Sequence, residues 1–301
     1  MVTQKTATAY VLLTITALCF GANTTLAKLS VGEISPMAMV TLRWGLVLIL
    51  VVTFNSKLLA RDWPVLKPQL GFLFTMGALG FAAFNGLFLI AAQYTSAINM
   101  GIISGMMPAF VLIGALIAYR TPTTGRQWLG VLITLVGVAV VTSGGDFARL
   151  LHLQINQGDL ILLFAAVLYA GYTVGLRRRP ASSALGLFAV LSASAFIVSL
   201  GMTAVEIGLG RFQSPTYPGW VLVVLVALFP SFLAQVAFIR GVEILGPGRA
   251  GIFVNLVPVF ATLIAVLYLG ENFQPHHAVA LTLVLGGIWL AERGGAEGKT
   301  S

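Results

Sequence analysis

Residues 101–118 read GIISGMMPAFVLIGALIA, a run of 18 residues without a charge. Residues 251–268 read GIFVNLVPVFATLIAVLY and carry the same Gly, Pro and Phe at the first, eighth and tenth positions. An apolar helix of about 20 residues is long enough to cross the roughly 30 Å hydrocarbon core of a bilayer. Both stretches are therefore predicted to be membrane-spanning helices, and their similarity indicates an internal repeat.

The whole chain has this apolar character. Of its 301 residues, 58% are apolar and 9% are charged, whereas about 25% of the residues in a soluble domain are charged. Strands of spanning length are implausible in lipid, so the sequence predicts an all-α membrane protein. We expect ten transmembrane helices, at residues 9–29, 37–54, 71–91, 97–118, 127–143, 160–176, 184–209, 218–238, 249–268 and 278–291.

The basic residues predict an orientation for these ten spans. Thirteen of the 17 Lys and Arg residues fall on the side of the two termini, Arg43 lies inside a span, and only Lys28, Arg149 and Arg211 fall on the other side. Because positive loops stay in the cytoplasm, both termini are predicted to be cytoplasmic, in the inner (plasma) membrane of a bacterium. A cleaved signal peptide is the alternative for the first span, and the internal repeat argues against it.

One offset of 150 residues aligns the two halves along the whole chain. The aligned pairs include Gly21 with Gly171, Phe88 with Phe238, Pro108 with Pro258 and Gly137 with Gly287. Each half has five spans, an odd number, so the second half must cross in the opposite sense, as in the inverted repeats of many secondary transporters. We expect two such repeats, residues 1–145 and 146–301, in one membrane unit. Shared composition between two apolar, Gly-rich halves is the alternative explanation.

Short motifs along the chain resemble the EamA family of the drug/metabolite transporter superfamily. They read Cys19-Phe-Gly-Ala-Asn23, Thr41-Leu-Arg43, Asn255-Leu-Val-Pro258 and Tyr268-Leu-Gly-Glu271. The first half departs from the last motif, because Arg120 and Thr121 stand where Gly270 and Glu271 are expected. Within the family the chain looks most like YddG-type aromatic amino-acid exporters. The resemblance implies ten helices around a central cavity, alternating access, and export of aromatic and some other amino acids.

Polar side chains at mid-depth indicate the transport path, since lipid cannot satisfy their hydrogen bonds. The amides of Asn23, Asn85 and Asn255 are stronger candidates than the serines, because an amide needs several partners and a serine can bond its own helix backbone. Hydrogen bonding between neighbouring helices is the alternative role for each of them.

Aromatic residues gather at the same depth. Tyr169 and Tyr172 are predicted to face the interior, because each hydroxyl needs a polar partner. Phe84 and Phe88 share one helix face, and Met107 offers an adaptable apolar surface, although packing is the alternative for all three. The predicted substrate-binding residues are Asn23, Phe84, Asn85, Phe88, Met107, Tyr169, Tyr172 and Asn255.

Other residues are predicted to shape the helices. Pro108 and Pro258 are expected to bend or gate their spans. The small-residue motifs at residues 101–105 and 171–175 are expected to allow close helix packing. Arg43 is expected to snorkel or to bind backbone carbonyls. No carboxylate lies at mid-depth, so the sequence does not indicate how transport is energised.

The sequence does not favour an enzyme. It lacks the metalloprotease, serine hydrolase and phosphate-loop motifs, its three histidines fall in predicted loops, and it has one cysteine, Cys19, so no cofactor or metal is predicted. A nucleotide-sugar carrier of the same superfamily is the main alternative. Phosphate recognition calls for Lys or Arg in the cavity, and only Arg43 lies within a span, which favours a zwitterionic or neutral solute. The expected partners are a small molecule, an amino acid, and membrane lipid. Nucleic acid is not expected, and the oligomeric state stays open.

Overall fold

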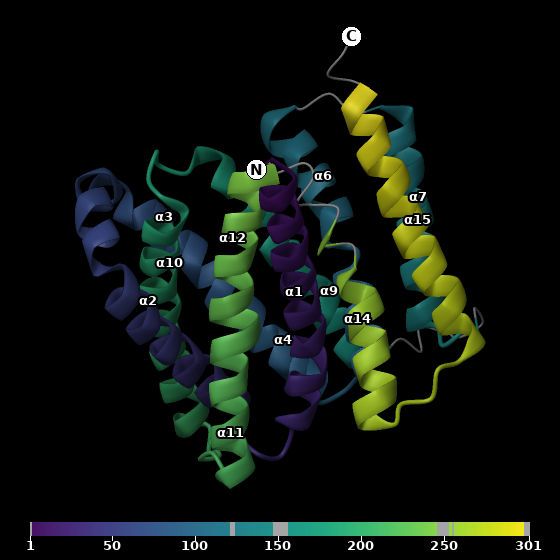
Figure 1. Ribbon diagram of the computed structural model, residues 1–301. Coiled ribbons are helices and arrows are strands. Elements are labelled where there is room, and N and C mark those ends of the chain that lie inside the picture. The colour runs from purple at the N-terminus through teal and green to yellow at the C-terminus, as the bar shows by residue number, and fades with distance from the viewer. Residues whose placement is uncertain (1, 121–123, 147–155, 246–252, 255, 298–301) are drawn as a thin grey trace.

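The computed structural model describes residues 2–120, 124–146, 156–245, 253–254 and 256–297, and every regular element among them is a helix (Figure 1). The predicted all-α class is therefore confirmed for the described part of the chain. The α-helices are α1 (Val2–Leu29), α2 (Pro36–Leu66), α3 (Leu70–Gly77), α4 (Phe84–Ala92), α5 (Ala97–Ser104), α6 (Met107–Tyr119), α7 (Gly125–Thr142), α9 (Gln157–Gly175), α10 (Ala184–Gly208), α11 (Tyr217–Val226), α12 (Ala234–Leu245), α14 (Val257–Ile264) and α15 (Pro275–Glu297).

Shorter helical turns join some of these helices end to end. The π-helical segments are η2 (Ala78–Ala83), η4 (Ala227–Leu233) and η5 (Ala265–Leu269), and the 3₁₀ turns are η1 (Lys67–Gln69) and η3 (Leu176–Arg178). The helix α1 begins and α15 ends at the same end of the bundle, called here the upper end (Figure 1). The opposite end is the lower end.

Six described helical stretches are long and apolar enough to cross a membrane, and three more apolar helices are shorter. The longest stretch, Pro36–Ala92, has 57 residues, which at 1.5 Å per residue is about 85 Å, far more than a bilayer core. It turns back at η1, so that α2 runs up the bundle and α3 to α4 run down it (Figure 1). The helix α2 is also broken at Asn55, where φ is −129°. The predicted spans 37–54 and 71–91 lie on either side of these interruptions.

The helices α2 and α10 pack along each other in opposite directions, and each caps the other. At the upper end, the Asp62 carboxylate of α2 accepts a hydrogen bond from the Ser183 amide at the start of α10, at 2.8 Å. At the lower end, the Glu206 carboxylate of α10 accepts hydrogen bonds from the Ser35 hydroxyl at 2.6 Å and from the Met37 amide at 3.3 Å. A carboxylate at a helix N-terminus satisfies free amides and favours the helix dipole, so both ends of this pair are fixed.

The helices α7 and α15 form a second closely packed pair. A side-chain carbon on Gly287 would lie 2.5 Å from the carbonyl oxygen of Gly130, and one on Gly137 would lie 3.0 Å from the carbonyl oxygen of Ala280. Because these neighbours are backbone atoms, only glycine lets the two helices approach this closely.

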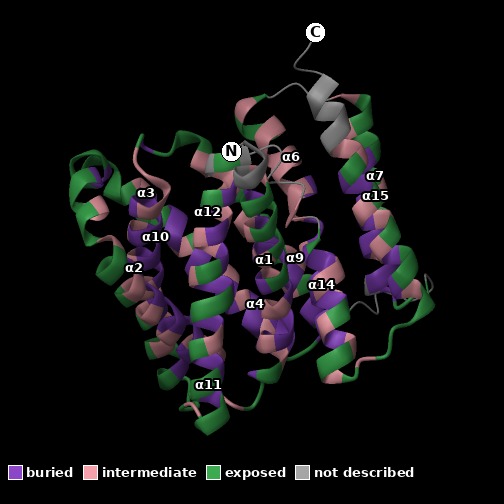
Figure 2. Cartoon of the chain, viewed as in Figure 1, coloured by how far each residue is buried: buried purple, intermediate pink, exposed green. Residues whose placement is uncertain are grey.

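Between the two pairs, α1 packs against α12 and α14, and α9 packs against α4 and α6. Along the long helices, buried and exposed residues form separate faces (Figure 2). Large apolar side chains such as Ile49, Ile117 and Leu267 are 63%, 77% and 68% exposed, as expected for faces that contact lipid rather than water.

Close helix packing at small residues was expected in two motifs, and it is found at residues 101–105 but not at Gly171. Gly101 and Gly105 pack closely against Ala261 and Pro258, as predicted for close helix contact. The same expectation is wrong at Gly171, which is exposed and would have no atom within 4 Å of an added side-chain carbon.

Pro108 and Pro258 each lie in the first turn of a helix, α6 and α14. A proline in this position loses no helical hydrogen bond, because the first-turn amides have no partner within the helix. The predicted span 97–118 is accordingly two helices that meet just before Pro108. Part of the predicted span 249–268 lies outside the described residues.

Candidate functional site

Six aromatic side chains from three parts of the chain form one continuous line of ring contacts, which we call the aromatic row. The ring centroids are 4.6 Å apart for Trp44 and Phe81, 5.3 Å for Phe81 and Tyr172, 5.5 Å for Tyr172 and Tyr169, 4.9 Å for Tyr169 and Phe84, and 5.8 Å for Phe84 and Phe88. All these separations are in the range of favourable aromatic contacts. Four members were predicted as substrate-binding residues, and the structure brings these four together.

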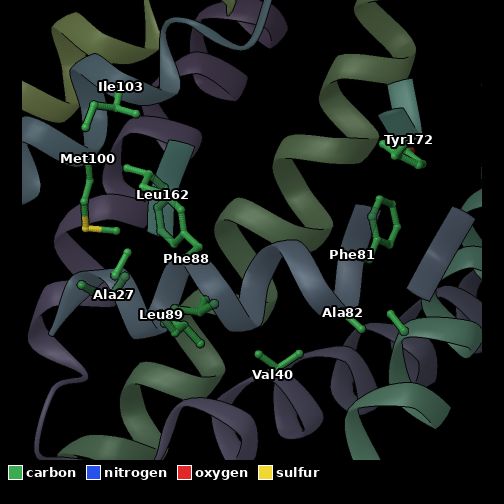
Figure 3. Packing of buried hydrophobic residues seen from close by; sticks show 14 of the residues in the cluster. Ala27, Val40, Phe81, Ala82, Phe88, Leu89, Met100, Ile103, Leu162 and Tyr172 are labelled. Carbon is green, nitrogen blue, oxygen red and sulfur yellow. The ribbon is translucent and has the colours of Figure 1, made fainter. Parts of the chain in front are cut away.

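The local backbone explains how the row forms. The π-helical segment η2 lies in the middle of its span and carries Phe81, while Phe84 and Phe88 follow on one face of α4. Gly80 leaves room for the ring of Tyr172 from α9, since a side-chain carbon there would lie 2.5 Å from Tyr172 Cδ2. Figure 3 shows the rings of Phe81 and Tyr172 next to each other and Phe88 beside Leu162.

The side chains of Tyr169 and Tyr172 are at least half-buried, but their hydroxyls lack hydrogen-bond partners among the described residues. Tyr172 is 5% exposed and Tyr169 is half-buried, and neither hydroxyl makes a hydrogen bond to any part of the chain that the structure describes. A tyrosine hydroxyl in an apolar setting usually finds a partner. These two hydroxyls are therefore free to bind water or a solute.

Arg43 lies at the Trp44 end of the aromatic row. It is 6% exposed, its Nε donates to the Ser231 hydroxyl and its Nη1 donates to Asn85 Oδ1, both at 2.6 Å. Its guanidinium carbon lies 5.4 Å from the centroid of the Trp44 ring. The expectation that Arg43 snorkels or binds backbone carbonyls is therefore wrong, because two polar side chains from other helices offer nearer acceptors.

Both partners of Arg43 are anchored on π-helical segments. Asn85 Nδ2 donates to the carbonyl of Phe81 in η2, and the hydroxyl of Ser231, which lies in η4, donates to the carbonyl of Val226 just before η4, again at 2.6 Å each. A π-helical turn leaves carbonyls that ordinary helical hydrogen bonds do not use, and such turns occur often at functional sites. The polar centre thus joins two irregular helix segments through one arginine.

Both halves of the chain match one known protein family. The profile of the EamA-like transporter family matches residues 7–143 and again residues 156–292. The chain belongs to the EamA-like transporter family. Its function class is therefore a membrane transporter of the drug/metabolite superfamily.

The relatives of this EamA-like chain are transporters from several organisms. An uncharacterized transporter of Bacillus subtilis, YyaM, is 28% identical over 94% of this chain and 92% of its own length. An uncharacterized inner membrane transporter of Escherichia coli, YedA, is 24% identical over 91% and 87%. A solved crystal structure with 18% identity superposes with a TM-score of 0.64 over 95% of this chain and 96% of the other, which supports the fold.

The remaining predicted site residues of this EamA-like protein do not join the aromatic row. Asn23 on α1 is half-buried and makes no side-chain hydrogen bond within the described residues. Met107 is half-buried in the first turn of α6. Pro108 lines a small cavity of about 150 Å³ between α6, α7 and α15, below the size usual for ligand sites. Asn255 lies outside the described residues.

Residues that sequence reasoning did not select complete the site. Trp44, Phe81 and Ser231 were not among the predicted site residues. The adjacent Arg43 and Trp44 in an otherwise apolar span were an available signal, because a charge at depth needs partners from several helices. Ser231 carried no such signal, since a serine usually bonds its own helix.

The lower end of the EamA-like bundle is tied together by buried polar groups around the connection from α4 to α5. Lys28 Nζ donates to the carbonyls of Ala92 at 2.9 Å and Thr95 at 2.8 Å. The Thr95 hydroxyl donates to the fully buried Asp159 carboxylate, at 2.5 Å. These bonds join α1, the end of α4 and the start of α9.

Glu271 ties the second half of the chain to the same connection. Its carboxylate accepts hydrogen bonds from the amides of Ala97 at 2.8 Å and Ile98 at 3.0 Å, the first two residues of α5. Gly270 before it adopts a positive φ of 65°, which only glycine tolerates easily. The motif ending in Gly270 and Glu271 therefore places a carboxylate at a helix N-terminus, where the helix dipole favours it.

Proposed function

We propose that this EamA-like transporter exports amino acids, mainly aromatic and other apolar ones, across the bacterial inner membrane by alternating access. The observation that carries the proposal is the aromatic row. Its rings offer stacking surfaces to a planar side chain, and the two tyrosine hydroxyls offer polar contacts without first breaking bonds to the protein. The resemblance to YddG-type exporters agrees with this substrate class.

We further propose that the chain consists of ten transmembrane helices in two inverted repeats, residues 1–145 and 146–301. The family profile matches twice, once in each proposed repeat. The helices that pack antiparallel, α2 with α10 and α7 with α15, are the ones that the offset of 150 residues pairs. The segments η2 and η4 also fall at equivalent positions. These pairings support a two-fold axis in the membrane plane.

Alternating access requires that the two ends open in turn. At the lower end, Lys28, Asp159 and Glu271 hold the connection from α4 to α5 by hydrogen bonds. We infer that these bonds break when the transporter opens toward the lower end. Pro108 and Pro258, each at the start of a helix in mid-span, are the proposed pivots.

A nucleotide-sugar or other metabolite carrier of the same superfamily is the alternative function. Phosphate recognition favours several cationic groups, whereas one described cation, Arg43, lies against a ring of the aromatic row. We therefore expect purified protein in liposomes loaded with phenylalanine to exchange it, saturably, for external tryptophan, tyrosine and phenylalanine, and more slowly for threonine. Exchange of a uridine diphosphate sugar without exchange of any amino acid would contradict the proposal.

We propose that the upper end, with both termini, faces the cytoplasm, because most loop Lys and Arg residues lie there. A cysteine at Ser182, placed in a Cys19→Ser background, is expected to resist a membrane-impermeant maleimide in intact cells and to react after lysis. Arg211→Cys, in the exposed connection at the lower end, is the matched control and is expected to react from outside. External labelling at position 182 would reverse the orientation.

A further inference from the structure

The guanidinium of Arg43 is a buried charge without a counter-charge. Burying an ion is costly unless an opposite charge or strong hydrogen bonds compensate it. Arg43 is 6% exposed, yet it forms no salt bridge with any carboxylate in the part of the chain that the structure describes. Its two bonded partners, Asn85 and Ser231, are neutral. The centre of the protein thus holds a positive charge that the described part of the chain does not balance.

The neutral partners fix the guanidinium but leave part of it unused. An arginine has five N–H donors, and the bonds to Ser231 and Asn85 use one on Nε and one on Nη1. Nη2 makes no hydrogen bond within the described residues. Because Ser231 and Asn85 are themselves bound to backbone carbonyls, the orientation of the Arg43 fork is set from two sides.

A second unused donor lies beside the first. The indole Nε1 of Trp44 is buried and has no hydrogen-bond partner among the described residues, and Trp44 as a whole is 3% exposed. The guanidinium carbon of Arg43 lies 5.4 Å from the centroid of this indole ring. The unused Nη2 of Arg43 and the unused indole N–H of Trp44 therefore lie on two neighbouring residues at one end of the aromatic row.

We propose that Arg43 and Trp44 bind the carboxylate of the transported solute, while its apolar part lies along Phe81 and Tyr172. Arginine matches a carboxylate in both charge and fork geometry, and a single arginine suits one monoanionic group. In the proposed second repeat, Ala193 and Ser194 stand at the equivalent positions, so only one such site is expected. The inference rests on the proposed function and adds that the solute must be a carboxylate.

The low exposure of Arg43 has a consequence for how the carboxylate enters. Asn85 and Ser231 are held by η2 and η4, one segment from each proposed repeat. A carboxylate would reach the guanidinium when either segment moves and releases its bond. Binding of the solute is thereby linked to the segments expected to move in alternating access.

Competition in wild-type protein tests the site directly. Phenylalanine is expected to inhibit labelled phenylalanine exchange in proteoliposomes about 10- to 100-fold better than phenylalaninamide, which lacks the carboxylate charge. In Arg43→Gln the ratio of the two inhibition constants, for the amide and for phenylalanine, is expected to approach one. In Arg43→Lys, which keeps the charge without the fork, this ratio is expected to lie between one and the wild-type value. Arg211→Gln, which removes an exposed arginine, is the matched control and is expected to retain the wild-type ratio.

Other outcomes separate this inference from the proposed function. Equal inhibition by phenylalanine and its amide in wild type, or a wild-type ratio in Arg43→Gln, would overturn the carboxylate site while leaving amino-acid export intact.

If Arg43→Gln does not fold, Trp44→Phe removes the indole donor and keeps a ring, and it is expected to lower the ratio. If no amino acid is exchanged, thermal stabilisation by 3-phenylpropionate but not by 3-phenylpropanamide still supports the site, and equal effects of both reject it.

Discussion

Gly80→Ala is expected to disrupt the aromatic row and to reduce phenylalanine exchange at least tenfold. The added carbon would lie 2.5 Å from Tyr172 Cδ2 and 2.7 Å from Tyr172 Cβ, so the base of the side chain is in the way and the ring cannot simply rotate aside. Overpacking of this kind costs about 1–3 kcal/mol. Displacement of Tyr172 also removes its contacts with Phe81 and Tyr169, each worth about 0.5–1.5 kcal/mol. Thermal melting in detergent and exchange in liposomes measure the two effects.

Gly171→Ala is the matched control for this change. It adds the same methyl group one residue before Tyr172, at a position with no atom within 4 Å. It is expected to melt and exchange like wild type. A Gly80→Ala protein that does the same would show that Tyr172 does not occupy this position in the working transporter.

Tyr169→Ala is expected to weaken aromatic solutes selectively. Tyr169 contacts both Phe84 and Tyr172, and loss of one stacked ring, about 0.5–1.5 kcal/mol, corresponds to about two- to thirteenfold weaker binding. Threonine has no ring to stack, so its exchange is expected to change less than about twofold. Half-saturation concentrations for phenylalanine and threonine, measured with equal amounts of reconstituted protein, test this difference.

Tyr268→Ala removes the same side chain from a site that is 79% exposed, and it is expected to affect neither solute. Equal losses for phenylalanine and threonine in Tyr169→Ala would assign Tyr169 a structural role and remove the main support for an aromatic substrate.

The sequence predicted the helical stretches well because hydrophobic length is a strong constraint in lipid. The predicted spans 160–176 and 184–209 lie close to α9 and α10, since charged or turn-forming residues bound each run. Interruptions inside a span were harder to foresee. The segment η4 contains Pro230, which was an available signal for an irregular turn, whereas η2 has no proline and leaves no change in hydropathy.

The candidate site was predicted in its aromatic part and not in its polar centre. Phe84, Phe88, Tyr169 and Tyr172 share a depth, and depth can be estimated by counting along each span. The direction in which the Arg43 side chain points cannot be estimated in this way, because its partners Asn85 and Ser231 are 42 and 188 residues away in the sequence. Only the folded structure shows that the Arg43 guanidinium, which was expected to snorkel, lies against the ring of Trp44.

The exchange of caps between α2 and α10 also bears on how the protein is made. Ser35 is bound by Glu206, which follows it by 171 residues. At a synthesis rate of about 5–20 residues per second, roughly 10–30 seconds separate the appearance of the two groups from the ribosome. During this interval the Glu206 carboxylate is not available to the start of α2. The first half therefore reaches its final form only after most of the second half has entered the membrane, and a truncated first half is expected to be a target for membrane proteases.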